Sequence, residues 1–195
     1  MRPETFALMD ALGDVPVYIL GRRTDVLAAN AAARAVLTDF NSHSARERNA
    51  VRWVVLDESA RSLWGDGWET AVAELVGALR MDAARFPDDP KMAELVGELS
   101  IKSEMFRKWW GVQRVVEYRR GQKVLHHPLV GELTLQAEDV TFPGEPDQTM
   151  FTYLAKPGSP SETALKLFAT WSDAPAARGD VPAARAAAPE ALRRQ

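Results

Sequence analysis

The sequence contains no cysteine and only three histidines among its 195 residues. The missing thiols exclude disulfides, thiolate nucleophiles and cysteine-ligated zinc, and they fit a reducing compartment such as the cytoplasm. His126 and His127 are neighbours, so on a strand their side chains would point to opposite faces, and His43 stands alone. We therefore predict no metal site and no cofactor, and we expect a soluble, cytoplasmic protein.

Long apolar runs are also missing. Residues 15–20 form the longest early run, and this segment, which includes Pro16, is too short for a membrane span or a signal-peptide core. The net charge of -3 argues against a surface built for DNA phosphates, which needs clustered lysine and arginine. We expect neither membrane insertion nor direct DNA binding by this chain.

Catalytic signatures are absent as well. The sequence has no glycine-rich phosphate loop and no Gly-x-Ser-x-Gly nucleophile motif. Two carboxylate pairs, Asp88-Asp89 and Glu138-Asp139, lie beside a proline or near a predicted strand bend, where caps and turns are the expected role rather than a general acid and base. We predict that the protein is not an enzyme.

The composition suits one globular domain followed by a tail. Hydrophobic residues make up 46% of the chain and charged residues 26%, so a full core can form. From residue 174 onward the chain consists mostly of alanine, proline and arginine and has no aromatic residue, so it cannot offset the entropy of ordering. We predict a domain at residues 1–173 and a disordered tail at residues 174–195.

The first half of the chain predicts two strands and then a long helical segment. Strands are predicted at residues 15–20 and 26–29, with a short hairpin loop between them. Asn30, Asn49 and Asp89 each precede a helical pattern and can cap it. Two apolar stripes at spacings of three and four, one starting at Trp68 and one at Met92, indicate long amphipathic helices.

The second half predicts three more strands and a closing helix. The strands are predicted at residues 112–118, 133–142 and 150–155, and the helix at 161–171. The alternation of apolar residues changes phase near Glu138-Asp139, which predicts a β-bulge or a strong bend there. This order predicts an α+β, PAS-like fold, a five-stranded antiparallel sheet with an extended helical segment between strands 2 and 3.

Seven segments appear in a familiar order: DVPVYILGRRTDVLAAN, RERNAVRWVVLDESAR, WETAVAELVGALR, PDDPKMAELVGELS, SEMFRKWW, HPLVGELTL and PDQTMFTYLAKPGSPSETAL. Together they resemble the MmyB-like ligand-binding domain, a PAS-like sensor that follows an XRE-type helix-turn-helix in bacterial transcription regulators. Two positions depart from the family pattern. Ala29 stands where a tryptophan is frequent, and Gln113-Arg114-Val115 stands in place of His-Asp-Val.

The resemblance implies a noncatalytic sensor of a small apolar molecule, with a fatty acid as the ligand class. It implies DNA binding only through a helix-turn-helix, which this chain does not contain. Met1 stands only a few residues before the domain. We interpret the chain either as an excised fragment or as a sensor without its own DNA reader.

Candidate ligand-binding residues are polar groups beside the apolar stripes and aromatic residues within them. A fatty acid gains about 0.8 kcal/mol per buried methylene, and its buried carboxylate needs a partner. The candidates are Arg48, Asn49, Trp53, Arg80, Ser103, Phe106, Trp109, Trp110 and His127.

Each candidate also has a structural interpretation. Arg48-Asn49 can be a helix cap with a surface ion pair, and Arg80 can stabilise a helix C-terminus. Ser103 can bond to its own helix, and the aromatic residues can be ordinary core. His127 precedes a proline and can fix a turn. A ligand-free dimerisation or interaction module is therefore the alternative function, with a homodimer left open, either through the first helix or through the tail if it orders.

Overall fold

The computed structural model describes residues 1–112 and 121–173, with side chains described as far as residue 168. The predicted tail at residues 174–195 lies outside the described residues. So does nearly all of the predicted strand at 112–118 and the Gln113-Arg114-Val115 segment. Among the described residues, no helix is both long enough and apolar enough to cross a membrane.

Five antiparallel strands form one open sheet in the order β2-β1-β5-β4-β3. The strands are β1 (Val17–Leu20), β2 (Val26–Ala29), β3 (Gly121–His127), β4 (Gly131–Phe142) and β5 (Glu145–Ala155). The order places the two early strands beside the last one, as in PAS domains. The predicted α+β, PAS-like fold is confirmed.

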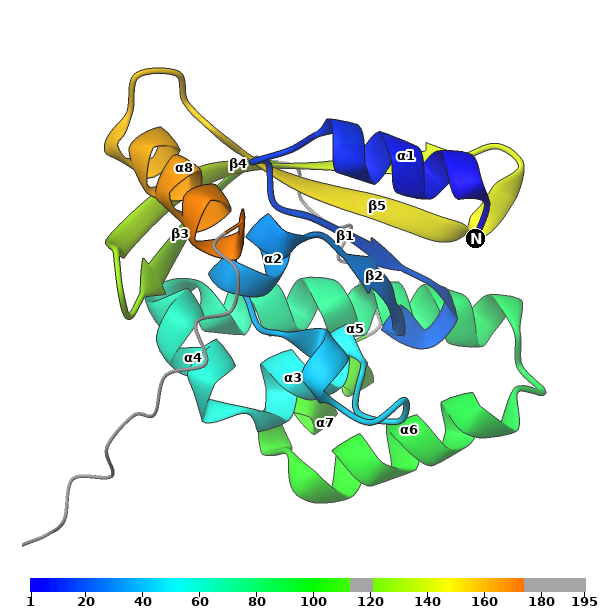
Figure 1. The fold of residues 1–195 in the computed structure, drawn as a ribbon. Helices are drawn as coiled ribbons and strands as arrows, with labels where there is room; N and C mark the ends of the chain where they lie inside the picture. The colour runs from blue at the N-terminus through cyan, green and yellow to red at the C-terminus, as the bar shows by residue number, and fades with distance from the viewer. Residues whose placement is uncertain (113–120, 174–195) are drawn as a thin grey trace, which may run out of the picture.

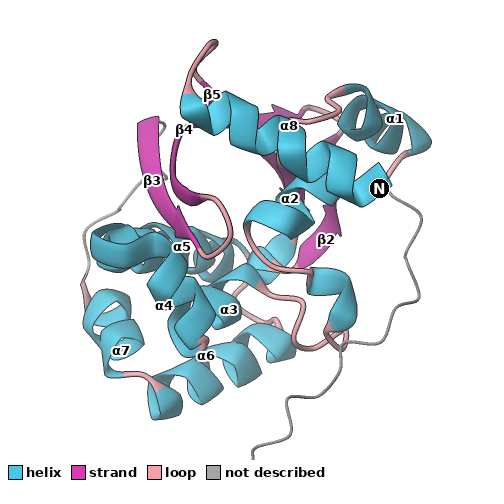
Figure 2. Ribbon diagram, turned by 60° about the vertical axis from the view of Figure 1, so that its left-hand side comes forward, coloured by secondary structure: helices cyan, strands magenta, loops and turns pink. Residues whose placement is uncertain are grey.

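Helices cover the two faces of the sheet unequally (Figure 1). Helix α1 (Pro3–Ala11) lies on one face, and the helical segment between β2 and β3 lies on the other. That segment contains α2 (Ala31–Val36), η2 (Phe40–Ser42), α3 (Ala50–Leu56), α4 (Glu58–Trp64), η3 (Gly65–Gly67), α5 (Trp68–Arg85), α6 (Pro90–Lys102) and α7 (Glu104–Gly111). Helix α8 (Pro160–Asp173) packs against α2 and β4, and α6 and α7 lie farthest from the strands (Figure 2).

The predicted caps are present. The side chains of Asn30, Asn49 and Asp89 accept hydrogen bonds from the backbone N–H groups of Ala33, Arg52 and Lys91, at 2.9, 3.0 and 3.0 Å. Each cap satisfies one N–H group that would otherwise lack a partner at a helix start. These helices therefore begin where the local sequence places them.

Two helix boundaries differ from the prediction. The second apolar stripe is not one helix, because Ser103 has an extended backbone and its Oγ accepts the N–H of Phe106 at 3.1 Å, which ends α6 and starts α7. Arg80 does not end its helix either, since α5 continues to Arg85. The apolar spacing continues across Ser103 and so conceals the break, whereas the stripe of α5 ends at Leu79 although the helix itself continues.

The predicted bulge near Glu138 is also wrong. Glu138 pairs regularly with Thr152, and the register shift between β4 and β5 falls between Thr141 and Phe142. The change of apolar phase has another cause, because Phe142 packs against the small apolar cluster beneath α1, while Leu135 faces the main core. Strand β4 therefore contributes apolar side chains to both faces of the sheet.

The core has two parts, separated by the sheet. The larger part fills the space between the sheet and the helices α2 to α8. The smaller part consists of Met9, Val17, Ile19 and Met150 under α1. Strand β1 is buried on both faces, which explains why its sequence is a continuous apolar run rather than an alternating one.

Candidate functional site

A small apolar hollow lies between the sheet and the helices α3, α4 and α5. Its volume is about 20 Å³, roughly enough for one water molecule. Five aromatic side chains, two alanines and one carboxylate account for most of its wall: Tyr18, Phe40, Trp53, Trp64, Tyr153, Ala50, Ala71 and Glu74. The wall of the hollow is therefore mostly apolar and contains a single charged side chain, that of Glu74.

Two indole N–H groups in this wall have no hydrogen-bond partner in the described part of the chain. The Nε1 atoms of Trp53 and Trp64 are buried, and neither meets a hydrogen-bond acceptor among the described residues. Trp68, by contrast, donates its indole N–H to the carbonyl oxygen of Val54 at 2.7 Å. A buried donor without a partner costs about 1–3 kcal/mol. An oxygen atom delivered by a ligand would remove that cost at either tryptophan.

An unpartnered indole does not define a site by itself. The Nε1 atom of Trp109 is also buried without an acceptor in the described part of the chain, and Trp109 does not line the hollow. What distinguishes Trp53 and Trp64 is that both belong to the wall of one cavity. The cavity and the donors together make this the strongest candidate site among the described residues.

The carboxylate in the wall belongs to a buried ion pair. Glu74 of α5 is 2% exposed, and both of its oxygens lie 2.7 Å from Nζ of Lys123 on β3. The Lys123 side chain is 10% exposed. A buried carboxylate of this kind needs a cationic partner, and removal of Lys123 would take away the one that the described residues give to Glu74.

The sequence analysis did not select Glu74 or Lys123, although a signal exists for each. Glu74 lies within the apolar stretch of α5, where a lone carboxylate requires a buried partner. Lys123 alternates with Leu125 and His127, so all three share one face of β3. The signals show that each residue is buried, but only the tertiary structure shows that the two meet.

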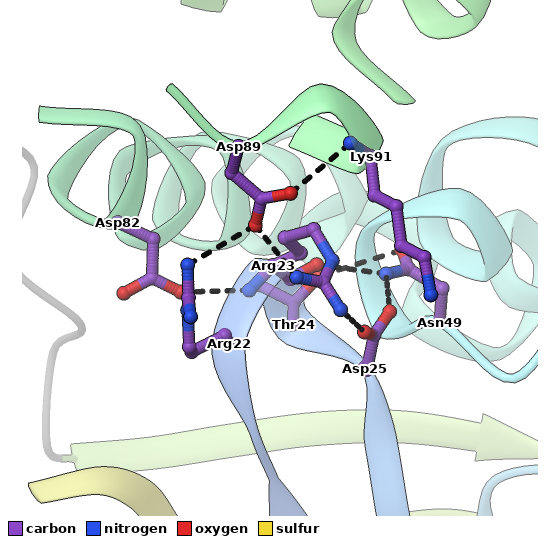
Figure 3. A network of polar contacts seen from close by, with 8 residues as sticks. All are labelled: Arg22, Arg23, Thr24, Asp25, Asn49, Asp82, Asp89 and Lys91. Atoms are coloured by element: carbon purple, nitrogen blue, oxygen red, sulfur yellow. Dashed lines mark hydrogen bonds and ion pairs between the residues drawn. The ribbon is translucent and has the colours of Figure 1, made fainter. Parts of the chain in front are cut away.

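A second polar cluster surrounds η1 (Arg22–Thr24) at the turn between β1 and β2 (Figure 3). Arg23 and Thr24 have positive φ angles of 59° and 61°, which non-glycine residues rarely adopt. Asp82 of α5 accepts the backbone N–H of Arg23 at 2.8 Å, and Asp89 accepts its guanidinium at 2.7 Å. Burial raises the pKa of Asp82 above its usual value, although the hydrogen bond from Arg23 opposes the rise.

Asn49 connects this turn to α3. Its Nδ2 donates to the carbonyl oxygen of Arg23 at 2.7 Å and to Oδ1 of Asp25 at 3.0 Å, while its Oδ1 caps α3. The side chain is 2% exposed. Within the described residues Asn49 is therefore a structural connector between β2 and the helical segment (Figure 3).

The structure separates the residues that the sequence selected as ligand contacts. Trp53 lines the hollow, and the other eight do not belong to the wall found among the described residues. Arg48 donates from Nε to the carbonyl oxygen of His43 at 3.1 Å, and Arg80 lies inside α5. Ser103 caps α7. Ligand contact stays a prediction for all nine.

The aromatic residues of α7 pack on their neighbours. Phe106 is fully buried and stacks on Trp110 with ring centroids 5.5 Å apart, and Trp109 and Trp110 are half-buried against the main core. The contacts between α7 and α5 hold this helix in place. In the described structure these rings form part of the core rather than the wall of the hollow.

His127 fixes a turn, as one interpretation of the sequence proposed. Its Nδ1 accepts the N–H of Leu129 at 3.2 Å, so the proton lies on Nε2, which donates to the carbonyl oxygen of Ala35 at 3.0 Å. The ring also packs edge-on against Phe168. Burial lowers the pKa of His127, although the bond to Ala35 opposes the decrease.

No group of three or more potential metal ligands occurs among the described residues. The open antiparallel sheet and its strand order define an α+β domain of PAS-like fold. The chain belongs to the family described as the MmyB-like transcription regulator ligand binding domain, whose model matches residues 1–168. A comparison with curated proteins found no match. The family match confirms the resemblance seen in the sequence and supports a ligand-sensing role in transcription regulation.

Proposed function

We propose that the domain binds a fatty acid or a similar apolar small molecule in the hollow beneath the sheet, and that it signals without catalysis. The observation that carries this proposal is the pair of unpartnered indole N–H groups, of Trp53 and Trp64, in one apolar cavity of a ligand-binding family member. A carboxyl or hydroxyl oxygen would accept a hydrogen bond there, while the tail would pack against the aromatic wall.

The size of the hollow sets a condition on this proposal. Pockets for small ligands usually enclose on the order of 300–1,000 Å³, and this one encloses about 20 Å³. A fatty acid therefore requires the wall to open by movement of its side chains. Trp53 and Trp64 are suited to move, because neither indole N–H forms a hydrogen bond to the described residues that would have to break.

The nearly filled interior supports a second candidate function. A ligand-free interaction module needs no cavity, and a core packed by side chains is what such a module would have. In that case the domain would transmit its signal through contacts with a partner or a second copy. DNA would be reached, in either case, through a helix-turn-helix of the regulator rather than through this ligand-binding domain.

Ligand extraction and thermal shift separate the two candidates. We expect native mass spectrometry of the purified protein to show bound lipid, and we expect saturated fatty acids of increasing length to raise the melting temperature. A ligand at a hundred times its Kd stabilises the folded state by about 2.7 kcal/mol. Absence of lipid, together with no thermal shift at any chain length, would favour the interaction module.

A cavity-filling variant tests the location. Ala50→Leu adds bulk to a residue that is 4% exposed and lines the hollow. Overpacking of this kind costs about 1–3 kcal/mol, so the variant should still fold. Ala93→Leu makes the same change on the exposed face of α6 and serves as the control. We expect the first variant, but not the second, to lose the thermal shift.

A further inference from the structure

The hollow shares part of its wall with a cleft on the surface. A surface cleft of about 560 Å³ lies outside the edge of the sheet, where η3 and the start of α5 face β3. Trp64 and Ala71 line both this cleft and the hollow. Glu74 lines only the hollow, and Lys123 lines only the cleft. The Glu74–Lys123 ion pair therefore links a residue that lines the hollow to a residue that lines the cleft.

Lys123 is the cation best placed to receive an anionic head group. The described lining of the hollow contains no lysine, arginine or histidine, and that of the cleft contains Lys123 and His126. For a ligand whose apolar tail lies in the hollow, the ammonium group of Lys123 is therefore the charged donor for the head group, at the part of the wall that the hollow and the cleft share. The unpartnered indole N–H of Trp64, which borders both spaces, supplies a neutral donor beside it.

Glu74 competes for the same ammonium. With an anionic ligand bound at the wall, two carboxylates would share one buried cation, and a second like charge in a buried site is unfavourable. Glu74 accordingly lowers the affinity for an acid and has no such effect on a neutral alcohol of equal length. The pair thus discriminates between head groups.

Resting on the proposed function, we propose that the Glu74–Lys123 pair is the head-group site of the sensor. The ligand tail fills the hollow, its carboxylate bonds to Nζ of Lys123 at the wall, and the cleft is the side from which it enters. In the ligand-free domain Glu74 forms an ion pair with Lys123. Because an acidic ligand must compete with Glu74 for this ammonium and a neutral one need not, Glu74 sets the preference between acidic and neutral amphiphiles.

Two probes with one tail test the assignment, dodecanoic acid and 1-dodecanol. Their affinities for the full chain are measured by calorimetry for the wild type, for Glu74→Gln and for the double variant Glu74→Gln/Lys123→Met. The double variant removes both charges, because Lys123→Met alone would leave a buried carboxylate uncompensated and could prevent folding. Circular dichroism confirms that each variant is folded.

We expect Glu74→Gln to bind the acid about tenfold more tightly than the wild type, which corresponds to about 1.4 kcal/mol. The double variant should lose that gain and bind the acid about tenfold more weakly than Glu74→Gln. Affinity for the alcohol should change by less than about threefold across the series, since a neutral head group does not depend on the charge of residue 123.

Two results would overturn the inference in different ways. If both probes bind the wild type but the double variant retains the acid affinity of Glu74→Gln, Lys123 is not the head-group partner, and the proposed function stands. If neither probe binds the wild type or any variant, the proposed function and the head-group site fall together.

Discussion

Replacement of Asn49 offers the sharpest test of how the early strands are held to the helical segment. Its amide forms four hydrogen bonds with the described residues: the cap of α3, two from Nδ2 to the turn that precedes β2, and a longer one of 3.4 Å that Oδ1 accepts from the hydroxyl of Thr24. Alanine at this position removes all four and leaves the carbonyl oxygen of Arg23 without its 2.7 Å donor. The substitution therefore acts at a single connector with known contacts.

The magnitude follows from the contacts. Loss of an N-cap costs about 1 kcal/mol, and each of the two hydrogen bonds from Nδ2 adds about 1 kcal/mol because its acceptor remains in the protein. We expect Asn49→Ala to lower the free energy of unfolding by about 3 kcal/mol. For a domain of this size, that lowers Tm by about 6–12 °C.

A serine variant separates the cap from the two other bonds. Asn49→Ser keeps a cap oxygen but cannot replace both Nδ2 donors, so its stability should exceed that of Asn49→Ala by about 1 kcal/mol. Urea unfolding followed by tryptophan fluorescence measures all three proteins. If Asn49→Ala lies within about 0.5 kcal/mol of the wild type, Asn49 does not connect β2 to α3 in the way described.

Three further predictions concern stability. Burial lowers the pKa of His127 below its usual value of about 6.5, so the unfolded chain binds a proton first. Stability should therefore decrease as pH falls from about 7.5 through 6.5 toward the folded pKa, and His127→Gln should flatten this dependence in urea titrations. An unchanged slope would exclude His127 as its source. Gly65 has a φ of 49°, and an added Cβ would lie 2.5 Å from a histidine ring of β3. Gly65→Ala should cost about 1–3 kcal/mol, whereas Gly97→Ala, which meets no such contact, should be neutral or stabilising in thermal melts. Equal effects would refute the close packing at Gly65. Lys123→Met should destabilise the domain by about 3–5 kcal/mol, and most of this loss should be recovered when Glu74→Gln is added. Failure of the double variant to recover would contradict the buried pair.

Local signals in the sequence were sufficient for the framework. Asn30, Asn49 and Asp89 were predicted as caps because a cap is decided by one side chain and the backbone N–H groups of the next turn. The α+β class and the PAS-like strand arrangement followed from periodicity and from the resemblance to one family. The boundary at Ser103 was missed, because the apolar spacing continues across it.

The candidate site depended on contacts between distant residues. The sequence selected Trp53, which lines the hollow, but it did not select Trp64, Glu74 or Lys123. Glu74 and Lys123 are 49 positions apart, and their contact requires α5 to pack against β3. No local sequence pattern predicts that these two residues are in contact.

The sequence by itself determined the helix caps at Asn30, Asn49 and Asp89, which faces are apolar and to which family the chain belongs, because these properties depend on neighbouring residues. The tertiary structure alone decided which side chains share a cavity and how large that cavity is. Packing of α3, α4 and α5 against the sheet sets both, and packing is a property of the whole core rather than of any segment.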